Sequence, residues 1–169
     1  THGFLYTGGT FSTIDVPGTS STHALGINNA GQIVGWFGTV DGNGRHGFVD
    51  VEGTLSTIDV PGELETFASG INDAGQIVGS FGDSEESHGF LDVGGTFRTI
   101  DVPGALYTHA TGINNAGQIV GLAEFGGFKV AHGFLDVEGT FTTIDFPGAF
   151  ETGAVGINNA GQIVGWVRL

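Results

Sequence analysis

The sequence of 169 residues contains no cysteine. This absence excludes a disulfide framework, a thiolate metal site and a catalytic cysteine, although it does not fix the cellular compartment. No run of apolar residues approaches the about 18 that a membrane-spanning helix needs, so we expect no insertion into a membrane. The chain starts at Thr1 rather than at Met, as expected of a mature protein or of an excised piece of a longer one.

Basic residues are also scarce. Four Lys and Arg stand against 18 Asp and Glu, which gives a formal net charge of −14. A surface this acidic repels a phosphate backbone and lacks the basic stripe of nucleic-acid-binding proteins, so we expect no nucleic-acid partner. The charge favours solubility at a salty or extracellular surface. The alternative is that the charge attracts cations or basic partners.

Glycine is abundant, with 33 residues, and much of it lies in a motif that occurs four times. The decamer Gly-Ile-Asn-Asn-Ala-Gly-Gln-Ile-Val-Gly begins at Gly26, and near-copies begin at Gly70, Gly112 and Gly156. His-Gly-Phe and Asp-(Val/Phe)-Pro-Gly recur in step with it, at spacings of 44, 42 and 44 residues. A period near 40 residues without a helical pattern predicts repeats that bury their faces against one another.

Each repeat predicts four short strands. In the first full repeat we expect them at 22–28, 32–37, 46–51 and 54–60. Asn29-Ala30-Gly31 and Glu52-Gly53 supply tight turns, and Pro61 ends the fourth strand because proline cannot donate to a ladder. Four antiparallel strands in a repeat of about 43 residues form the unit of a β-propeller blade.

We therefore predict an all-β fold, a four-bladed β-propeller that is a single domain over residues 1–169. The blades are expected at approximately 22–60, 66–102, 108–146, and 152–169 completed by 1–16. Two strands from each terminus would complete the last blade, closing the ring without an exposed edge. This closure places Thr1 beside Leu169 and makes the protein a monomer.

The joint pattern of the decamer, His-Gly-Phe-Leu and Thr-Ile-Asp-Val-Pro-Gly resembles the HAF-type extracellular repeat. The resemblance covers all four copies and implies propeller-like repeats in a bacterial protein that is secreted or displayed on the cell surface. The family brings no established catalytic residues, so the resemblance implies no active site. The departures (Asp73 for Asn, Leu55 for Phe and Phe146 for Val) leave the expected fold unchanged.

Four histidines recur in register, and each is predicted to face an aspartate across a hairpin. Counting back from the two-residue turns gives the pairs His2 with Asp15, His46 with Asp59, His88 with Asp101, and His132 with Asp145. Opposite charges that face each other on neighbouring strands contribute roughly 0.2–1 kcal/mol. Because the four histidines lie in four blades, we interpret them as structural rather than as ligands of one ion.

The copies differ in two sets of connections, which lie on the same face of a propeller: the loops between second and third strands, and the crossings between blades. We call this the variable face and expect function there, because recognition usually lies on loops held by a rigid scaffold. Its acidic and aromatic residues suit a carbohydrate, a cation or a basic peptide. The candidate ligand-binding residues are His23, Glu65, Phe67, Tyr107, His109 and Glu151. Trp36 and Trp166 fall in second strands, where a core role is favoured over a sugar platform.

Four of these residues also form a candidate metal site. His23 and His109 come from opposite blades, and Glu65 and Glu151 come from the other two. Two imidazoles and two carboxylates suit Zn²⁺ or another divalent cation. However, Glu and His stand on opposite sides of a shared threonine, so their side chains alternate in direction. We expect no certain cofactor; a divalent cation here, or an ion in the central channel, is the candidate.

No serine has a paired histidine and acid in the sequence: Ser20, Ser21, Ser84 and Ser87 lie in loops. We predict a non-enzymatic extracellular binding or surface-scaffold module, whose partner is a carbohydrate, a cation, a basic peptide or another protein. One alternative is a metal-dependent or carboxylate-based hydrolase with its site at the pore mouth, for instance with Glu65 and Glu151. The other is a structural fragment of a larger repeat array.

Overall fold

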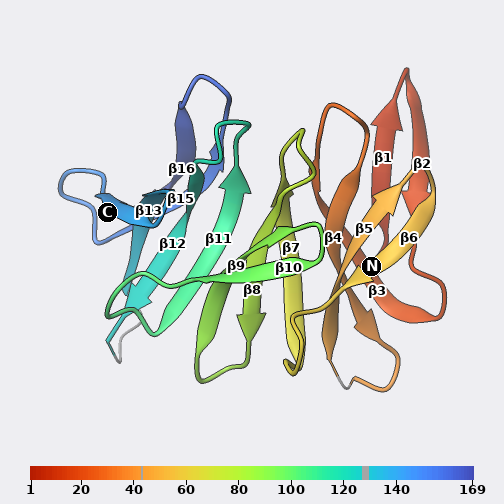
Figure 1. Cartoon of the computed structure of the whole chain (residues 1–169), viewed down its shortest axis with the longest axis horizontal. Helices are drawn as coiled ribbons and strands as arrows, with labels where there is room; N and C mark the ends of the chain where they lie inside the picture. The colour runs from red at the N-terminus through yellow and green to blue at the C-terminus, as the bar shows by residue number, and fades with distance from the viewer. Residues whose placement is uncertain (43, 127–129) are drawn as a thin grey trace.

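The structure, a computed structural model, describes residues 1–42, 44–126 and 130–169. These residues form 16 strands joined by turns and loops (Figure 1). The strands are β1 (Gly3–Thr7), β2 (Thr10–Ile14), β3 (Thr19–Ile27), β4 (Ile33–Thr39), β5 (Arg45–Val51), β6 (Thr54–Ile58), β7 (Glu65–Ile71), β8 (Ile77–Gly82), β9 (Ser87–Val93), β10 (Thr96–Ile100), β11 (Tyr107–Ile113), β12 (Ile119–Phe125), β13 (Val130–Val137), β14 (Thr140–Ile144), β15 (Glu151–Ile157) and β16 (Ile163–Arg168). The all-β prediction is confirmed. Among the described residues there is no helix of the length and apolarity that crossing a membrane requires.

The strands form three complete antiparallel units and two half units. We call β3–β6 unit A, β7–β10 unit B and β11–β14 unit C; β1–β2 is the N-terminal hairpin and β15–β16 the C-terminal hairpin. Neighbouring units meet through one parallel bridge each, Arg45 with Glu65 between units A and B and Ser87 with Tyr107 between units B and C. Inside each unit the strands pair in chain order, from the inner strand to the outer strand, as predicted.

The turn between first and second strands of each unit is built by an asparagine. The Oδ1 atom of Asn28 accepts hydrogen bonds from the backbone N–H groups of Ala30 and Gln32, at 3.1 and 2.9 Å. Gly31 then adopts a φ of 79°, which is a left-handed conformation that glycine adopts without strain. Asn72, Asn114 and Asn158 build the same turn. These turns make up the upper edge of the molecule in Figure 1, which we call the constant face.

The same asparagines join the units into a ladder. The Nδ2 group of Asn28 donates to the backbone oxygen of Asn72 at 3.0 Å, Asn72 donates to Asn114 at 3.1 Å, and Asn114 donates to Asn158 at 3.1 Å. One side chain therefore closes its own turn and also fixes the position of the next repeat.

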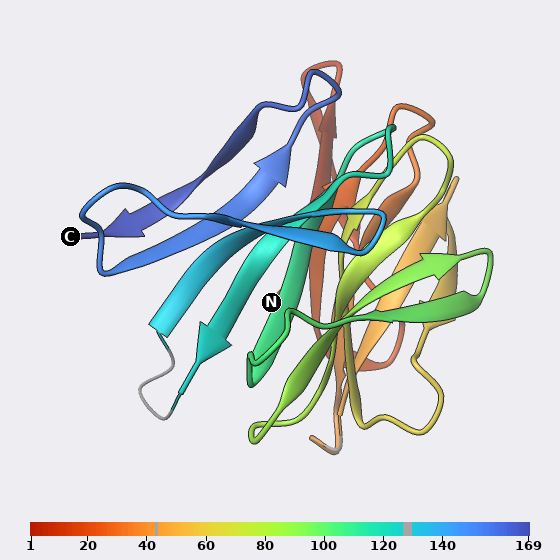
Figure 2. The ribbon, with the colours of Figure 1, turned by 60° about the vertical axis from the view of Figure 1, so that its left-hand side comes forward.

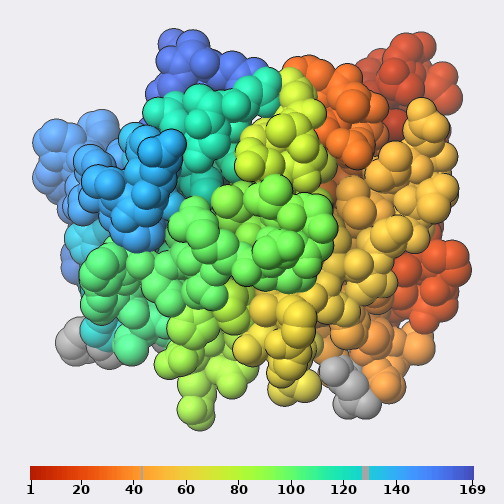
Figure 3. All heavy atoms as spheres, viewed as in Figure 1, coloured from red at the N-terminus to blue at the C-terminus, as the bar shows by residue number. Residues whose placement is uncertain are grey.

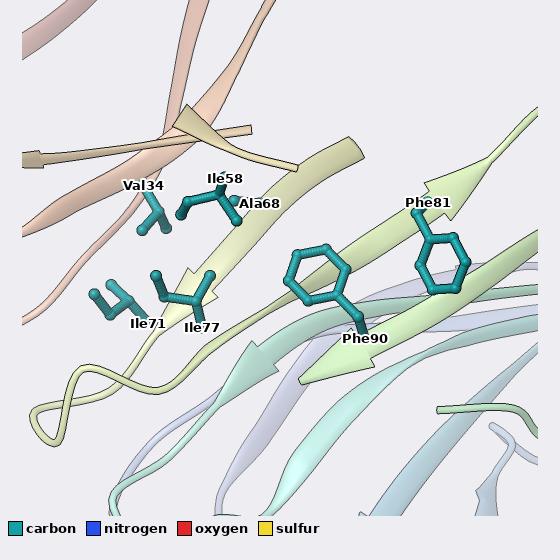
Figure 4. Close-up of a cluster of buried hydrophobic side chains, with 7 residues drawn as sticks. All are labelled: Val34, Ile58, Ala68, Ile71, Ile77, Phe81 and Phe90. Atoms are coloured by element: carbon teal, nitrogen blue, oxygen red, sulfur yellow. The ribbon is translucent and has the colours of Figure 1, made fainter. Parts of the chain in front are cut away.

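The core lies between units and is organised around one phenylalanine per unit. Phe90 of unit B packs with Ala68 and Ile77 of its own unit and with Ile58 of unit A (Figure 4). A Cβ atom on Gly79 would lie 2.7 Å from the Phe90 ring, so this position needs glycine. Fully burying one such aromatic side chain stabilises the fold by about 1.5–3 kcal/mol. Phe48 and Phe134 occupy the same place in units A and C.

The predicted closure of the ring is wrong. The N-terminal and C-terminal hairpins remain separate two-stranded sheets. They stand at opposite ends of an open arc in Figure 1, and Figure 2 brings the C-terminal end of the arc forward. Thr1 does not lie beside Leu169: its carbonyl accepts a hydrogen bond from the N–H of Thr22 at 3.0 Å, and the two ends of the chain are far apart in both views. The fourth blade predicted from 152–169 and 1–16 is therefore not assembled within the chain.

The physical reason for the open arc lies in how inner strands meet. A Cβ atom on Gly26 would lie 3.2 Å from the Cα of Gly70, and the same close contact links Gly70 to Gly112 and Gly112 to Gly156. Gly156, the last in this series, has no such contact with Gly26. The series of contacts does not return from Gly156 to Gly26, so the four repeats leave the arc open.

Candidate functional site

The variable face carries a groove over the junction of units B and C. The loop between β8 and β9, which contributes to its lining, lies along the lower edge of the molecule in Figure 1 and projects as a lobe in Figure 3. The groove has a volume of about 300 Å³. We call it the acidic groove; its lining residues are Glu65, Phe67, Ser80, Phe81, Gly82, Asp83, Ser84, Ser87, Tyr107, His109 and Glu124. Four of the six residues predicted to bind a ligand, Glu65, Phe67, Tyr107 and His109, line it together.

Tyr107 fixes one wall of the groove. Its hydroxyl donates a hydrogen bond to the backbone oxygen of Ser84 at 2.8 Å, and its backbone forms the parallel bridge with Ser87. The N–H of Ser87 donates to the carbonyl of Leu106 at 3.3 Å. The loop between β8 and β9 is thus tied to the crossing that enters β11, which holds the groove in shape.

His109 forms a contact that the sequence did not predict. Its Nε2 atom lies 3.3 Å from the Oγ of Ser87, and burial lowers the pKa of the imidazole, so the ring is neutral at pH 7. Ser87 is the first residue of β9 and precedes His109 by 22 residues, and the parallel bridge between units brings the two together. The N–H of Ser87 is already bonded to Leu106.

An arginine and three aromatic rings form the neighbouring surface. The Arg45 guanidinium bonds the Glu65 carboxylate at 2.9 Å and lies 5.6 Å from the Trp36 ring and 5.7 Å from the Phe67 ring. His23 stacks on Trp36 at a ring distance of 4.0 Å, and Trp36 meets Phe67 edge-on. Arg45 also lines a second hollow of about 730 Å³, which shares Glu65, Asp83 and Ser84 with the acidic groove.

The groove carries carboxylates, and the fold favours the ionised form of one of them, Asp83. The Asp83 carboxylate accepts hydrogen bonds from the N–H groups of Glu85 and Glu86, at 2.8 and 3.2 Å. These bonds lower the pKa of Asp83, because hydrogen bonds to the ionised form favour it. With Glu65 and Glu124 on the same lining, the arrangement suits the binding of a cation beside aromatic rings.

The predicted metal site is not assembled. Within the part of the chain that the structure describes, no three His, Cys, Asp or Glu side chains gather as a metal site requires. His23 stacks on Trp36, and Glu65 is paired with Arg45. Glu151 lies in the C-terminal hairpin and pairs with Arg168 at 3.1 Å, outside the acidic groove. The open arc and the alternating direction of neighbouring side chains on each inner strand keep the four residues apart.

All four predicted His–Asp contacts are present. The Nδ1 atoms of His2, His46, His88 and His132 lie 2.9, 3.0, 2.8 and 2.9 Å from the carboxylates of Asp15, Asp59, Asp101 and Asp145, respectively. Each contact joins the last two strands of its own unit. His88 has a second acidic partner, because its Nε2 atom lies 3.1 Å from Glu86. Burial lowers the pKa of His88, but the hydrogen bonds and charges of Asp101 and Glu86 outweigh burial and raise it.

Comparison with known proteins supports the architecture alone. No family model matches the chain, and no curated protein matches its sequence. A similar fold occurs in the β-propeller domain of the Trilobed protease from Pyrococcus furiosus, whose structure is described as having an open velcro topology. The TM-score is 0.60 at 11% sequence identity, over 85% of this chain and 43% of that chain. The chain therefore has propeller-like repeats and spans less than half the length of that structure. Membership of the HAF-type repeats stays a prediction.

Proposed function

We propose that this chain is a non-enzymatic binding module, that the acidic groove is its ligand site, and that its ligand is a basic peptide. The extracellular location implied by the resemblance to HAF-type repeats is part of the proposal. The groove supports it through its chemistry: Glu65, Asp83 and Glu124 supply negative charge, and Phe67 and Tyr107 supply aromatic surface. Peptide guanidinium groups bind such surfaces by ion pairing and by cation–π attraction.

The single observation that carries the proposal is the position of Arg45. Its guanidinium already lies against Phe67 and Trp36 and bonds the Glu65 carboxylate at 2.9 Å. The protein thus binds one of its own arginines with the groups that border the groove. A peptide arginine next to Asp83 would find the same chemistry, because the partners given for that carboxylate among the described residues are the backbone N–H groups of Glu85 and Glu86.

The test is a titration with short peptides of opposite charge. A Gly-Arg-Gly-Arg-Gly peptide is expected to bind, its Glu counterpart is not, and binding should weaken as salt rises because exposed charges are screened. Asp83→Asn keeps an oxygen that can accept the bonds of its turn but removes the charge. Asp83→Asn and Phe67→Leu are each expected to weaken binding about 2- to 5-fold. Glu138→Gln, outside the groove lining, is the matched control and should bind as the parent chain does.

A substitution at Arg45 is expected to strengthen peptide binding, whereas the other two substitutions weaken it. Arg45→Gln releases Glu65 and Phe67 from their internal partner, so the same peptide should bind more tightly. If neutral oligosaccharides bind and their binding does not depend on salt, the ligand is a carbohydrate and not a peptide. The proposal would be overturned if the arginine peptide does not bind, or if it binds the Asp83→Asn and Arg45→Gln variants with equal affinity.

A further inference from the structure

The two ends of the arc expose apolar surface that the interior units bury. Val164 on β16 is 68% exposed, whereas its equivalents Val34, Val78 and Val120 are fully buried. Phe4 on β1 is 63% exposed, whereas Phe48, Phe90 and Phe134 are at most 2% exposed. Since the sequences of these repeats are nearly the same, the exposure comes from missing neighbours.

Each interior phenylalanine fills a frame of four residues. The three filled frames are Ile14, Ala24, Ile33 and Gly35 around Phe48; Ile58, Ala68, Ile77 and Gly79 around Phe90; and Ile100, Ala110, Ile119 and Gly121 around Phe134. The repeat predicts a fourth frame at Ile144, Ala154, Ile163 and Gly165. These four residues line a largely apolar hollow of about 360 Å³. Among the described residues, one frame is thus empty, and Phe4, the equivalent of Phe48, Phe90 and Phe134 in the repeat, has no frame.

The free strand edges match in the same register. Within units A, B and C the second strand pairs with the third so that Gly35 faces Phe48, Gly79 faces Phe90 and Gly121 faces Phe134. By the repeat, β16 is a second strand and β1 is a third strand. Among the described strands, β16 pairs only with β15 and β1 only with β2. Pairing β16 with β1 in this register would set Gly165 opposite Phe4, which would enter the empty frame.

The packing between inner strands and the asparagine ladder are also incomplete at the two ends of the arc. Val34 packs with Ile71 and Ile77 of the next unit, which predicts that Val164 packs with Ile27 and Ile33 of a following N-terminal end. Ile27 is half exposed, whereas its equivalents Ile71 and Ile113 are buried. Asn158 is the last member of the ladder, and its Nδ2 group is placed to donate to the backbone oxygen of a following Asn28.

We propose that two copies of this chain dock head to tail, each C-terminal hairpin completing a four-stranded unit with the N-terminal hairpin of the other copy. The chain's own hairpins stand at opposite ends of the arc, so the occupant of the empty frame is Phe4 of a second copy. Two identical junctions related by a two-fold axis close a ring and leave no edge exposed. The size fits, because this chain corresponds to 43% of a propeller of similar fold. This proposal is independent of the acidic groove.

The first experiment is the mass of the 169-residue chain in solution. We expect a species of twice the 17.3 kDa chain mass that dissociates on dilution. Phe4→Glu should weaken dimerisation at least about 100-fold, because each of two junctions loses at least about tenfold in affinity. Leu64→Glu is the matched control, since Leu64 is similarly exposed, at 70%, but lies in the interior of the arc. A chain that stays a monomer at all concentrations, or an assembly larger than two chains, would overturn the proposal.

A second experiment identifies which strands meet. The chain has no cysteine, so a His2→Cys chain mixed with a Val167→Cys chain reports on one junction; facing Cβ atoms on paired strands lie about 5 Å apart. Oxidation should give a disulfide-linked heterodimer. In the double variant, disulfide bonds between two chains support the proposal, and a disulfide within one chain shows instead that the arc closes on itself. No disulfide in either sample would contradict the proposed pairing of β16 with β1.

Discussion

The interior junctions and the two ends of the arc are built from the same residues but in different environments. At the junctions, Phe90 and Val78 are fully buried and an asparagine ties each repeat to the next. At the ends, Phe4 and Val164 are exposed. Burial in this fold is therefore a property of the neighbouring unit and not of the residue. Stability should accordingly be a sum of unit terms and nearest-neighbour junction terms.

The largest expected contrast is between two phenylalanines. Phe90→Ala should lower the free energy of unfolding by about 3–5 kcal/mol, because it leaves a cavity inside the frame of Ile58, Ala68 and Ile77. Phe4→Ala in the dilute, monomeric chain should lower it by less than about 1 kcal/mol, since the side chain is already exposed. Urea unfolding of both variants checks this. Equal losses would mean that Phe4 is buried within the chain and that the ends are not open.

The asparagine ladder predicts a smaller contrast. Asn72 and Asn158 make the same bonds within their own turns, but only Asn72 donates to the next unit, at 3.1 Å to the carbonyl of Asn114. Asn72→Ala should cost about 0.5–1.5 kcal/mol more than Asn158→Ala, because it removes one hydrogen bond between units while the carbonyl of Asn114 keeps its bond from the N–H of Gly117. Chemical denaturation measures the difference. If both changes cost the same, the bonds between units contribute nothing and the ladder does not hold the arc together.

The local structure was accessible from the sequence because short-range geometry determines it. Two-residue turns and the alternation of side chains determine which residues face each other, so the partner of His88 followed from counting to Asp101. The closure of the ring did not follow. It depends on the rotation between successive units, which arises from packing at Gly26, Gly70 and Gly112, and a small error in that rotation is multiplied over four repeats.

The candidate site was also predictable in part: the sequence indicated its residues but not their contacts. The variable crossings pointed to Glu65, Phe67, Tyr107 and His109, which do line one groove. The partners of these residues come from neighbouring units through the parallel bridges, as Ser87 does for His109 and Arg45 for Glu65. No spacing within a repeat encodes such a contact. The parallel bridge between the third strand of one unit and the inner strand of the next is the rule that would have found both.

The turns between third and fourth strands should be insensitive to position along the arc. Gly8 in the N-terminal hairpin and Gly94 in unit B adopt left-handed φ values of 57° and 61°. A left-handed non-glycine residue costs roughly 1–2 kcal/mol, and glycine loses about 0.5–1 kcal/mol more backbone entropy on folding. Gly8→Glu and Gly94→Glu should therefore each lower the free energy of unfolding by the same amount, about 0.5–1 kcal/mol. Glu52 has a φ of 53°, and Glu52→Gly should therefore raise the free energy of unfolding by the same amount. Unequal losses in urea unfolding would show that the turns also depend on their neighbours.

The smallest contrast concerns His88 and His2, and it depends on pH. His88 is held by Asp101 and Glu86, whereas His2 is exposed and has Asp15 alone. Because the folded-state pKa of His88 is raised above its ordinary value of 6.5, its stabilisation is complete below that value and is lost as the pH rises through the folded pKa. His88→Gln should therefore cost about 0.2–0.5 kcal/mol more near pH 5.5 than near pH 8.5; His2→Gln, which removes a histidine with one acidic partner, is the comparison variant. Thermal melts of both variants at the two pH values measure it. A His88→Gln loss that is equal at both pH values, or greater at the higher one, would mean that the imidazolium contributes nothing to the fold and that the histidine is retained for its neutral hydrogen bond alone.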